Sequence, residues 1–494
     1  NNDQTIFPEK QIKSLCPFCG VGCQTLVSVK DNKIVAIDGQ NGPANENRLC
    51  VKGRFGFDYI NSPLRLTTPL IRISKKSKSW DISIDDKDIY KYFRKASWEE
   101  ALDLASKKFT EILKSNKINS LAGFGSAKGS NEEAYIFQKL IRTGFETNNV
   151  DHCTRLCHAS SVAALLQSVG SAAVSAPFTA VKDSECIILI GARPEQNHPV
   201  AASYFKQAVK NGTKLIILDP RKQSLSRYAT HHLQFNPGQD LALLNAMIFT
   251  IINENLTNKE YIENYTEGFE QLEKEIKKFN PVLMEKLCGI RKEIIREVAR
   301  IYAKAKTSII FWGMGISQHV HGTQNAFSLI NLALITGHLG KPGTGLHPLR
   351  GQNNVQGASD AGLIPMSYPD YNSVKIKTNN EKMEKFWNSN LDLNEGKTVV
   401  EIIKGINSGE IKGLYVQGEN PAMSDPDLIN TRKGLAKLDH LVVQDIFMTE
   451  TAWFADVVLP ASAHAEKLGT YTNTNRQVQI GRNVVDPPKG VKQD

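Results

Sequence analysis

The stretch "CPFCGVGC" (16–23) and the following "LCVKG" (49–53) contribute four cysteines near the start of the chain, namely Cys16, Cys19, Cys23 and Cys50. Four thiolates can hold a tetrahedral zinc ion or an iron–sulfur cube. Three ligands in one tight loop and a fourth from farther along favour the cube, because zinc sites usually take paired C-x2-C motifs. Gly20 and Gly22 let the backbone wrap closely around an inorganic core. The stretch predicts a [4Fe–4S] site, with zinc or unligated thiols as the alternatives.

Lys52 lies two residues after the fourth cysteine. A lysine at this position can be an ordinary surface cation. It can also lie beside the cluster and couple it electrostatically to a second redox group. Both interpretations stay open on the residues alone.

The composition is typical of a large globular protein. Hydrophobic residues make up 41% of the 494 residues, which is enough for several buried cores. The longest apolar run, 241–252, contains Asn245 and predicts a buried helix rather than a membrane span. The net charge of +9, from 60 basic and 51 acidic residues, comes without a basic stripe interleaved with aromatics. That pattern favours a solvated surface over nucleic-acid binding.

Cysteine usage indicates a reducing compartment. Four of the eight cysteines are packed at one end of a long chain, unlike the spread-out cysteines of a small secreted disulfide scaffold. We therefore expect a cytoplasmic protein that carries a metal site and inserts no segment into a membrane.

Six short apolar runs, each ending in a Gly-rich or acidic loop before a helical pattern, recur along the chain. They lie in residues 121–135, 186–199, 215–222, 309–319, 414–425 and 441–452. Strands that alternate with helices predict parallel, doubly wound sheets of an α/β protein. In such sheets ligands bind at the carboxyl ends of the strands. None of the loops has the glycine pattern of an NAD site or of a P-loop.

The number of these loops indicates a large ligand. Backbone N–H groups at helix starts favour phosphates, and an acid at a strand end, such as Asp219, suits a ribose or a purine edge. Together the loops predict a phosphate-bearing organic cofactor held between two α/β domains.

The segment "DHCTRLCHASSVAAL" (151–165) holds a second pair of cysteines. His158 directly follows Cys157, and a helical pattern begins at Ser160. A thiol just before a helix N-terminus and beside a protonated histidine has a lowered pKa. Cys157 is thus a candidate metal ligand or nucleophile, or a packed cysteine at a helix start. Cys153 is a candidate redox neighbour or a buried thiol.

The segment "HPLRGQNNVQGASD" (347–360) is rich in amides and poor in apolar residues. It can be an ordinary surface loop. It can also bind a carboxylate, because the guanidinium of Arg350 matches two carboxylate oxygens.

Together these segments resemble the large catalytic subunit of molybdopterin-dependent formate dehydrogenases, in the DMSO reductase superfamily. The cluster motif is similar to the cluster-binding start of that family, and "RLCHASSV" is similar to its metal-ligand segment. Its cofactor loops resemble "GMGISQH", "LRGQNNVQG", "QGENP" and "QDIFMTETA…ADVVLP". The resemblance extends over essentially the whole chain.

The resemblance implies roles for the matching residues. The four N-terminal cysteines would hold the [4Fe–4S] cluster, and Lys52 would lie between the cluster and one pterin. Cys157 would ligate molybdenum or tungsten, His158 would lie beside the metal, and Arg350 would grip the formate carboxylate. Two pterin guanine dinucleotides would supply dithiolene sulfurs to the metal. Their binding loops would include Asp219, Gly313, Met314, Gly315, Gln318, Gln352, Gly418, Glu419, Asn420, Asp445 and Thr449.

The family also implies a four-part fold, with two doubly wound α/β domains and a small N-terminal [4Fe–4S] domain. We expect residues 1–66, joined by about 455–494, to form the cluster domain. Residues 67–152 with 353–454 would form one pterin-binding domain and residues 153–352 the other. A β-barrel-like cap domain is expected beyond Asp494, and residues 75–94 are expected to form a surface insertion.

The implied reaction is the oxidation of formate to CO2. Electrons would pass through the cluster to an acceptor, which could be an NAD-linked flavin subunit, a ferredoxin, a hydrogenase or a quinone module. A nitrate reductase of the assimilatory or periplasmic type is the alternative within the superfamily, and His158 with Arg350 disfavours it. A non-catalytic iron–sulfur electron-transfer subunit and a zinc module with a passive α/β body are alternatives of other classes.

Overall fold

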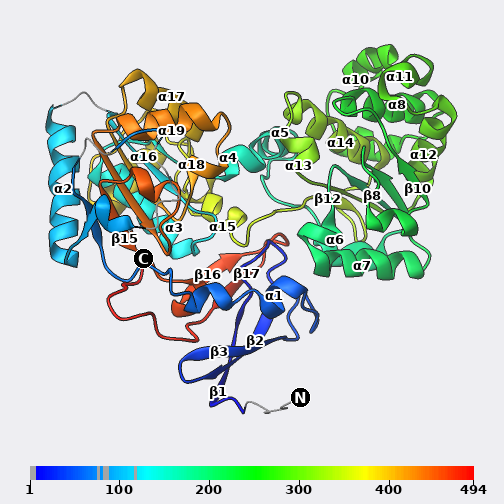
Figure 1. Cartoon of the computed structure of the whole chain (residues 1–494). Coiled ribbons are helices and arrows are strands. Elements are labelled where there is room, and N and C mark those ends of the chain that lie inside the picture. The colour runs from blue at the N-terminus through cyan, green and yellow to red at the C-terminus, as the bar shows by residue number, and fades with distance from the viewer. Residues whose placement is uncertain (1–6, 75–77, 82–87, 116–118) are drawn as a thin grey trace.

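A computed structural model describes residues 7–74, 78–81, 88–115 and 119–494. Its strands form four sheets, of seven, five, three and two strands. Figure 1 shows three parts around a common junction, which we name the seven-stranded part, the five-stranded part and the cluster part. The first lies on the left, the second on the right and the third below them.

The seven-stranded part combines segments from both halves of the chain. Its strands, in sheet order, are β5 (Phe93–Lys95), β4 (Leu70–Arg72), β15 (Val457–Pro460), β14 (His440–Asp445), β13 (Gly413–Gln417), β6 (Leu121–Gly125) and β7 (Val150–His152). The strands from β15 to β7 pair in parallel, whereas β4 and β5 are antiparallel to their neighbours. Its helices are α2 (Trp98–Ser115), α3 (Asn131–Gly144), α15 (Val355–Asp360), α16 (Lys377–Trp387), α17 (Val399–Ser408), α18 (Pro421–Ser424) and α19 (Leu428–Lys437).

Helices cover both faces of this sheet. Phe109 of α2 and Ile141 of α3 share a buried core with Leu121 of β6. On the other face, Ile402 of α17 packs in one core with Ala122 of the same strand. Neighbouring residues of β6 therefore point to opposite helix layers, as expected for a strand that is buried on both sides.

The five-stranded part is a parallel sheet. Its strands, in sheet order, are β10 (His231–Leu233), β9 (Lys214–Leu218), β8 (Cys186–Ile190), β11 (Ser308–Trp312) and β12 (Gly345–Pro348). Its helices are α5 (Ala159–Val169), α6 (Pro194–Asn197), α7 (Pro199–Lys210), α8 (Asp240–Asn253), α9 (Lys259–Tyr265), α10 (Phe269–Ile276), α11 (Pro281–Cys288), α12 (Lys292–Lys304), α13 (Met314–Ser317) and α14 (Gly322–Thr336). The short α4 (Thr154–Cys157) precedes α5.

The cluster part contains both early and late residues of the chain. It consists of β1 (Lys10–Leu15), β2 (Gln24–Lys30), β3 (Lys33–Gly39), α1 (Val51–Phe55), and the hairpin β16 (Gly469–Thr472) and β17 (Val478–Gly481). Ser14 and Arg482 join the two regions, because the Ser14 hydroxyl bonds both to the N–H and to the carbonyl of Arg482. Figure 1 shows the late hairpin lying above the early strands.

All six predicted strand ends are confirmed. The apolar runs correspond to β6, β8, β9, β11, β13 and β14, which lie within the two larger sheets. The run at 241–252 falls inside helix α8, as predicted. The fold class, two doubly wound α/β parts with a small cluster-binding part, is therefore as expected.

The division into domains stays a prediction, and the sheets give information on where the domain boundaries lie. β15 (Val457–Pro460) belongs to the seven-stranded sheet although it lies past the expected boundary near residue 455. Of the expected surface insertion, residues 75–77 and 82–87 lie outside the described residues. Its end contributes β5 (Phe93–Lys95), an edge strand paired with β4.

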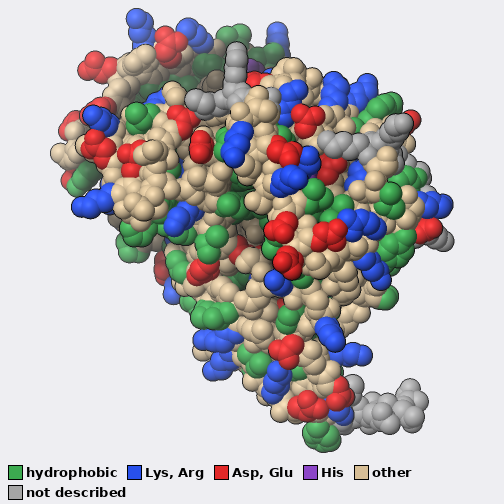
Figure 2. All heavy atoms as spheres, turned by 90° about the vertical axis from the view of Figure 1, so that its left-hand side faces the viewer, with side chains coloured by type: hydrophobic (Ala, Val, Ile, Leu, Met, Phe, Trp, Pro, Cys, Tyr) green, Lys and Arg blue, Asp and Glu red, His purple; other side chains and the backbone are tan. Residues whose placement is uncertain are grey.

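The surface is mixed in charge. Figure 2 shows basic and acidic side chains interspersed over the face of the seven-stranded part that it presents. In the described part of the chain, no helix is both long and apolar enough to cross a membrane.

Candidate functional site

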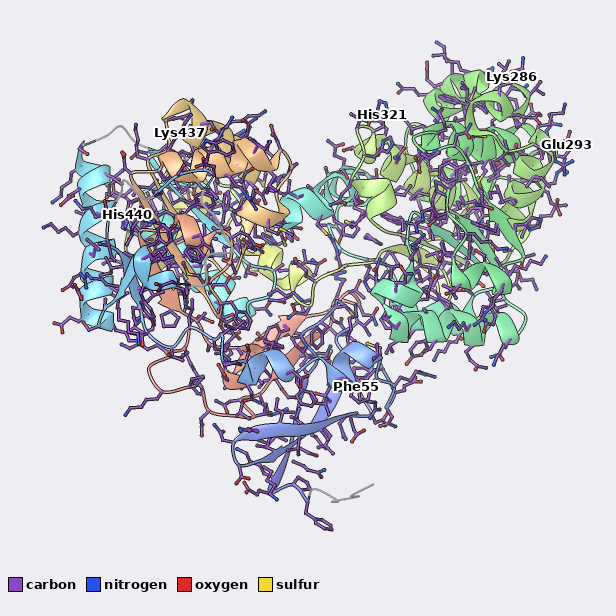
Figure 3. The ribbon with its side chains drawn as sticks, in the orientation of Figure 1. Phe55, Lys286, Glu293, His321, Lys437 and His440 are labelled. Carbon is purple, nitrogen blue, oxygen red and sulfur yellow. The ribbon has the colours of Figure 1, made fainter. Side chains whose placement is uncertain are left out.

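The cysteine loop is folded tightly at the junction of the parts. Cys16 N donates to Cys23 O at 2.9 Å, which closes the loop, and Gly22 adopts the left-handed region with φ 68°. The first three cysteines are buried, and Cys50, which caps α1, is partly exposed. In Figure 3, Phe55 at the end of α1 marks this region. The loop packs into the same apolar core as Ile187 of β8.

The donor set fits an iron–sulfur cluster. Burial raises the pKa of Cys16 to about 12, and repulsion from Cys19 adds to that rise. Burial also raises the pKa of Cys19 and of Cys23. Thiolates grouped in an apolar core need cations to take up their charge, and a cluster supplies one iron to each. Within the described residues, no three His, Cys, Asp or Glu side chains converge as ligands of a single metal ion.

Gly20 brings the cluster loop against the segment that carries Arg350. Gly20 N donates to Gly351 O at 3.0 Å, and Thr474 N donates to Gly20 O at 2.6 Å. A Cβ on Gly20 would overlap the carbonyl oxygen of Arg350. His198 Nε2 also lies 2.6 Å from that oxygen. The peptide at Arg350 is thus fixed from two sides.

Cys157 lies where two cavities meet. The larger cavity, of about 630 Å³, is lined by Cys19, Lys52, Cys157 and the ends of the five-stranded sheet. The smaller, of about 290 Å³, is lined by Cys157 and loops of the seven-stranded sheet. Cys157 therefore borders cavities at the carboxyl edges of both sheets, and Lys52 and Cys19 line the larger of them.

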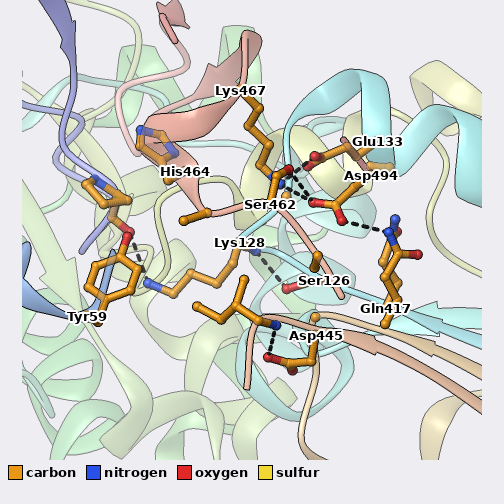
Figure 4. A pocket seen from close by; sticks show the side chains of 18 of the residues that line it. Tyr59, Ser126, Lys128, Glu133, Gln417, Asp445, Ser462, His464, Lys467 and Asp494 are labelled. Atoms are coloured by element: carbon orange, nitrogen blue, oxygen red, sulfur yellow. Dashed lines mark hydrogen bonds and ion pairs between the residues drawn. The ribbon is translucent and has the colours of Figure 1, made fainter. Parts of the chain in front are cut away.

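The predicted cofactor residues distribute over these cavities. Asp219, Gly313, Met314 and Gly315 line the larger one. Met314, Gln318, Gln352 and Glu419 line the smaller one. Gly418 and Asp445 line a third cavity of about 310 Å³, shown in Figure 4, on the other side of the cluster loop.

Two of the predicted cofactor residues hold their own loop together and line none of these three cavities. Asn420 Nδ2 donates to Glu450 Oε2 at 2.6 Å, and Asn420 Oδ1 accepts from the backbone and hydroxyl of Thr451. Thr449 Oγ1 accepts from Ala452 N at 3.3 Å. They shape the turn after β14 rather than face a ligand space.

The prediction of a lowered thiol pKa at Cys157 is wrong. Cys157 is the last residue of α4 and lies two residues before Ala159, where α5 begins. Burial raises the pKa of Cys157 to about 11, although the charge of Arg350 opposes that rise. Burial and the nearby Arg350 charge also hold the pKa of His158 well below its usual range, so His158 is neutral.

His158 and Arg350 lie behind the cavities, fully enclosed. His158 Nδ1 lies 3.0 Å from Ser317 Oγ, and its Nε2 lies 3.0 Å from Leu349 O. The Arg350 Nη2 donates to Ala172 O at 2.7 Å, while its Nε has no hydrogen-bond partner. Leu349 and Gly351, on either side of Arg350, do line the larger cavity.

The cavities fit a large polar cofactor. Gly315 N donates to Gly191 O at 3.0 Å, and a Cβ on Gly315 would lie 2.7 Å from Gly191 Cα. The close packing of these two loops therefore requires glycine, and both loops line the larger cavity. In the smaller cavity burial raises the pKa of Glu419 to about 8, and its Oε1 has no partner. Unpaired buried donors and acceptors of this kind indicate a ligand that satisfies them.

Sequence reasoning missed several residues of the site. Lys128 reaches the cluster loop, and Tyr59, His464 and Lys467 line the third cavity with it. The position of Lys128 just after β6, at one of the predicted strand ends, was the available signal. Nothing local distinguishes His464 or Lys467. His464 Nε2 lies 2.9 Å from Leu15 O, and Lys467 pairs with Glu133 and Asp494, and both arrangements arise only through tertiary packing.

Comparison with known protein families assigns the chain to one family. Residues 65–494 match the family described as molybdopterin oxidoreductase, and residues 9–62 match the molybdopterin oxidoreductase Fe4S4 domain. The chain belongs to the molybdopterin oxidoreductase family. The matched domains support one [4Fe–4S] cluster and a molybdenum or tungsten pterin cofactor, in agreement with the prediction.

Relatives narrow the class further. The chain is 43% identical to the F420-dependent formate dehydrogenase subunit alpha of Methanocaldococcus jannaschii, over 98% of this chain and 69% of the relative. It is 38% identical to formate dehydrogenase H of Escherichia coli, over 98% of this chain and 67% of the relative. The solved structure of acetylene hydratase from Pelobacter acetylenicus is similar in fold, with a TM-score of 0.79 and 22% identity. That likeness covers 98% of this chain and 68% of the hydratase.

Proposed function

We propose that this chain oxidises formate to CO2 at a molybdenum or tungsten centre held by two pterin guanine dinucleotides. The reaction HCOO⁻ → CO2 + H⁺ + 2 e⁻ releases two electrons, and a [4Fe–4S] cluster held by Cys16, Cys19, Cys23 and Cys50 would supply a one-electron carrier for them. The observation that carries the proposal is the position of Cys157, which lines both cavities while Lys52 and Cys19 line the larger one.

The bound metal centre supplies a two-electron acceptor with a soft sulfur shell. The sulfur of Cys157, at the end of α4, would be the protein ligand of this metal. The loops at Asp219 and at Gly313–Gly315, which line the larger cavity, would hold one dinucleotide, and those at Gln352 and Glu419, which line the smaller one, would hold the other. Lys52 places a cation between that centre and the cluster.

Arg350 is proposed to bind the substrate. Its unpaired Nε keeps hydrogen-bonding capacity for a carboxylate, and a guanidinium matches two carboxylate oxygens. The bonds from Gly20 and His198 to the carbonyls of Gly351 and Arg350 fix the backbone from which this side chain extends. His158, kept neutral and bonded to Ser317 and Leu349, packs behind Cys157 and orients the segment that carries it.

The alternatives fit less well. Curated relatives at 38–43% identity over nearly the whole chain are named formate dehydrogenases, so the nitrate reductase alternative is not favoured. A non-catalytic electron-transfer subunit has no use for Cys157 at the meeting point of two cavities.

The proposal also covers the electron acceptor and the cellular compartment. Formate is the substrate, and an external electron-transfer protein or subunit takes the electrons. The relative from Methanocaldococcus jannaschii is named F420-dependent, and that property is not carried over to this chain. All eight cysteines are free of disulfides, which supports our placing of the protein in the reducing cytoplasm.

A dye assay tests the function directly. Purified holoenzyme is expected to reduce a viologen dye with formate and to contain iron together with molybdenum or tungsten. Nitrate with reduced viologen serves as the competing substrate. Iron without molybdenum or tungsten, or turnover with nitrate alone, would contradict the proposal.

A further inference from the structure

Lys128 reaches the cluster loop from a different part of the molecule. It lies between β6 and α3, in the seven-stranded part. Its Nζ donates to Pro17 O at 3.0 Å and to Phe18 O at 3.4 Å. These two carbonyls belong to the residues between the cluster ligands Cys16 and Cys19. Figure 4 shows the side chain extended across the third cavity toward Tyr59 and the loop.

The base of this lysine is fixed. Lys128 N donates to Ser126 Oγ at 3.0 Å. The carbonyls on either side of it, of Ala127 and Gly129, accept from the backbone and side-chain N–H groups of Asn354 at 3.1 and 2.9 Å. Asn354 is fully buried and lies four residues after Arg350. The segment proposed to bind substrate therefore also fixes the lysine that contacts the cluster loop.

Lys128 and Lys52 approach the loop from different cavities. Phe18 lines both the larger cavity and the third cavity. Lys52 lines the first of these, on the side of Cys157, and Lys128 lines the second. The loop is thus approached by two lysines, of which Lys52 shares its cavity with Cys157 and Lys128 does not.

We propose that Lys128 is a positioning residue that clamps the Cys16–Cys19 loop and holds a positive charge at the cluster, raising its reduction potential. Reduction adds one electron, and so one negative charge, to the cluster. A cation fixed nearby stabilises the reduced form more than the oxidised form. The proposal rests on the cluster assignment within the proposed function and is independent of formate as the substrate.

An EPR-monitored redox titration of the holoenzyme tests the charge. The wild type, Lys128→Gln and Lys128→Arg are reduced stepwise with dithionite and mediators. Glutamine can still donate to the two carbonyls but is neutral, so its midpoint potential is expected to shift to a more negative value. Arginine keeps the charge and is expected to retain the wild-type value. Lys33→Gln removes the same charge from the exposed start of β3 and is expected to cause no shift.

Two results would overturn the proposal. One is a wild-type potential in Lys128→Gln with full iron content. The other is a shift in Lys128→Arg as large as that in Lys128→Gln. If the glutamine variant holds no cluster, Lys128→Arg must both retain iron and keep the wild-type potential, and its failure to do so also overturns the proposal. Because dithionite is the reductant, a chain inactive with formate leaves this outcome unaffected.

Discussion

Cys157 shows how the site depends on individual residues. Sequence alone placed a cysteine and a histidine together, and the structure puts the cysteine at the meeting point of two cavities. The sign of the thiol pKa shift was not predictable, because it depends on burial by residues far along the chain rather than on neighbours. A thiol with a pKa raised to about 11 is stabilised as a thiolate only by a bound cation.

Replacement of Cys157 by alanine is expected to abolish formate turnover and to leave the visible and EPR spectra of the cluster intact. The reason is that the cluster takes its ligands from a separate loop. The measurement is a viologen assay together with spectra of the reduced protein. Cys288→Ala, in the buried core of the five-stranded part, is the control and is expected to keep turnover. Full activity in Cys157→Ala would remove its role as a ligand.

Replacement of Arg350 by lysine is expected to raise KM for formate and to lower kcat. A planar fork becomes a point charge, and the loss of one charged hydrogen bond lowers kcat/KM roughly tenfold to a hundredfold. Steady-state kinetics measure the effect. Arg227→Lys, on the exposed surface, is the control. Unchanged kinetics at position 350 would disprove the clamp.

At the scale of elements, strand ends were predictable and contacts between elements were not. The runs that became β6, β8, β9, β11, β13 and β14 carry their signal locally, in apolar residues followed by glycine or acid. The packing of the cluster loop on the Arg350 backbone joins residues far apart in sequence. Neither segment has a local sequence pattern that predicts its contact with the other. The glycine at position 20 is consistent with a close approach of another backbone segment.

Gly20→Ala is expected to weaken both the cluster and substrate binding. The added methyl group overlaps the Arg350 carbonyl oxygen, and overpacking of this kind costs about 1–3 kcal/mol. We expect lower iron content per chain and a higher KM for formate, measured on the same preparation. Gly144→Ala, whose Cβ meets only Leu140 Cδ1 at 3.3 Å, is the control. Wild-type iron content and KM in Gly20→Ala would show that the contact is dispensable.

At the scale of the whole molecule, one buried ion pair ties early and late segments together. Arg65 donates to both carboxylate oxygens of Glu466, at 2.9 and 2.8 Å, and both side chains are almost fully buried. Arg65 also donates to Ile60 O at 2.8 Å. Sequence reasoning expected residues after about 455 to join the cluster domain, but it did not identify this pair, which depends on a separation of 401 residues.

Glu466→Gln is expected to lower the free energy of unfolding by about 3–5 kcal/mol, because it leaves the Arg65 charge buried without its counter-charge. Denaturant unfolding followed by fluorescence measures the change in midpoint. Glu254→Gln breaks the Glu254–Arg300 pair, which is partly exposed, and is expected to change stability by about 0–1 kcal/mol. An equal effect in the two variants would contradict this assignment.

The bonds between Ser14 and Arg482 set an order of events during synthesis. The early strands leave the ribosome first, yet the hairpin that completes their contacts emerges only after both larger sheets have been translated. The cysteine loop therefore lacks its contacts with the hairpin, from Thr474 to Gly20 and from Gln479 to Gly22, until nearly all of the described chain has been translated. Until the hairpin packs against them, the thiols of this loop are more exposed to oxidation than in the folded protein.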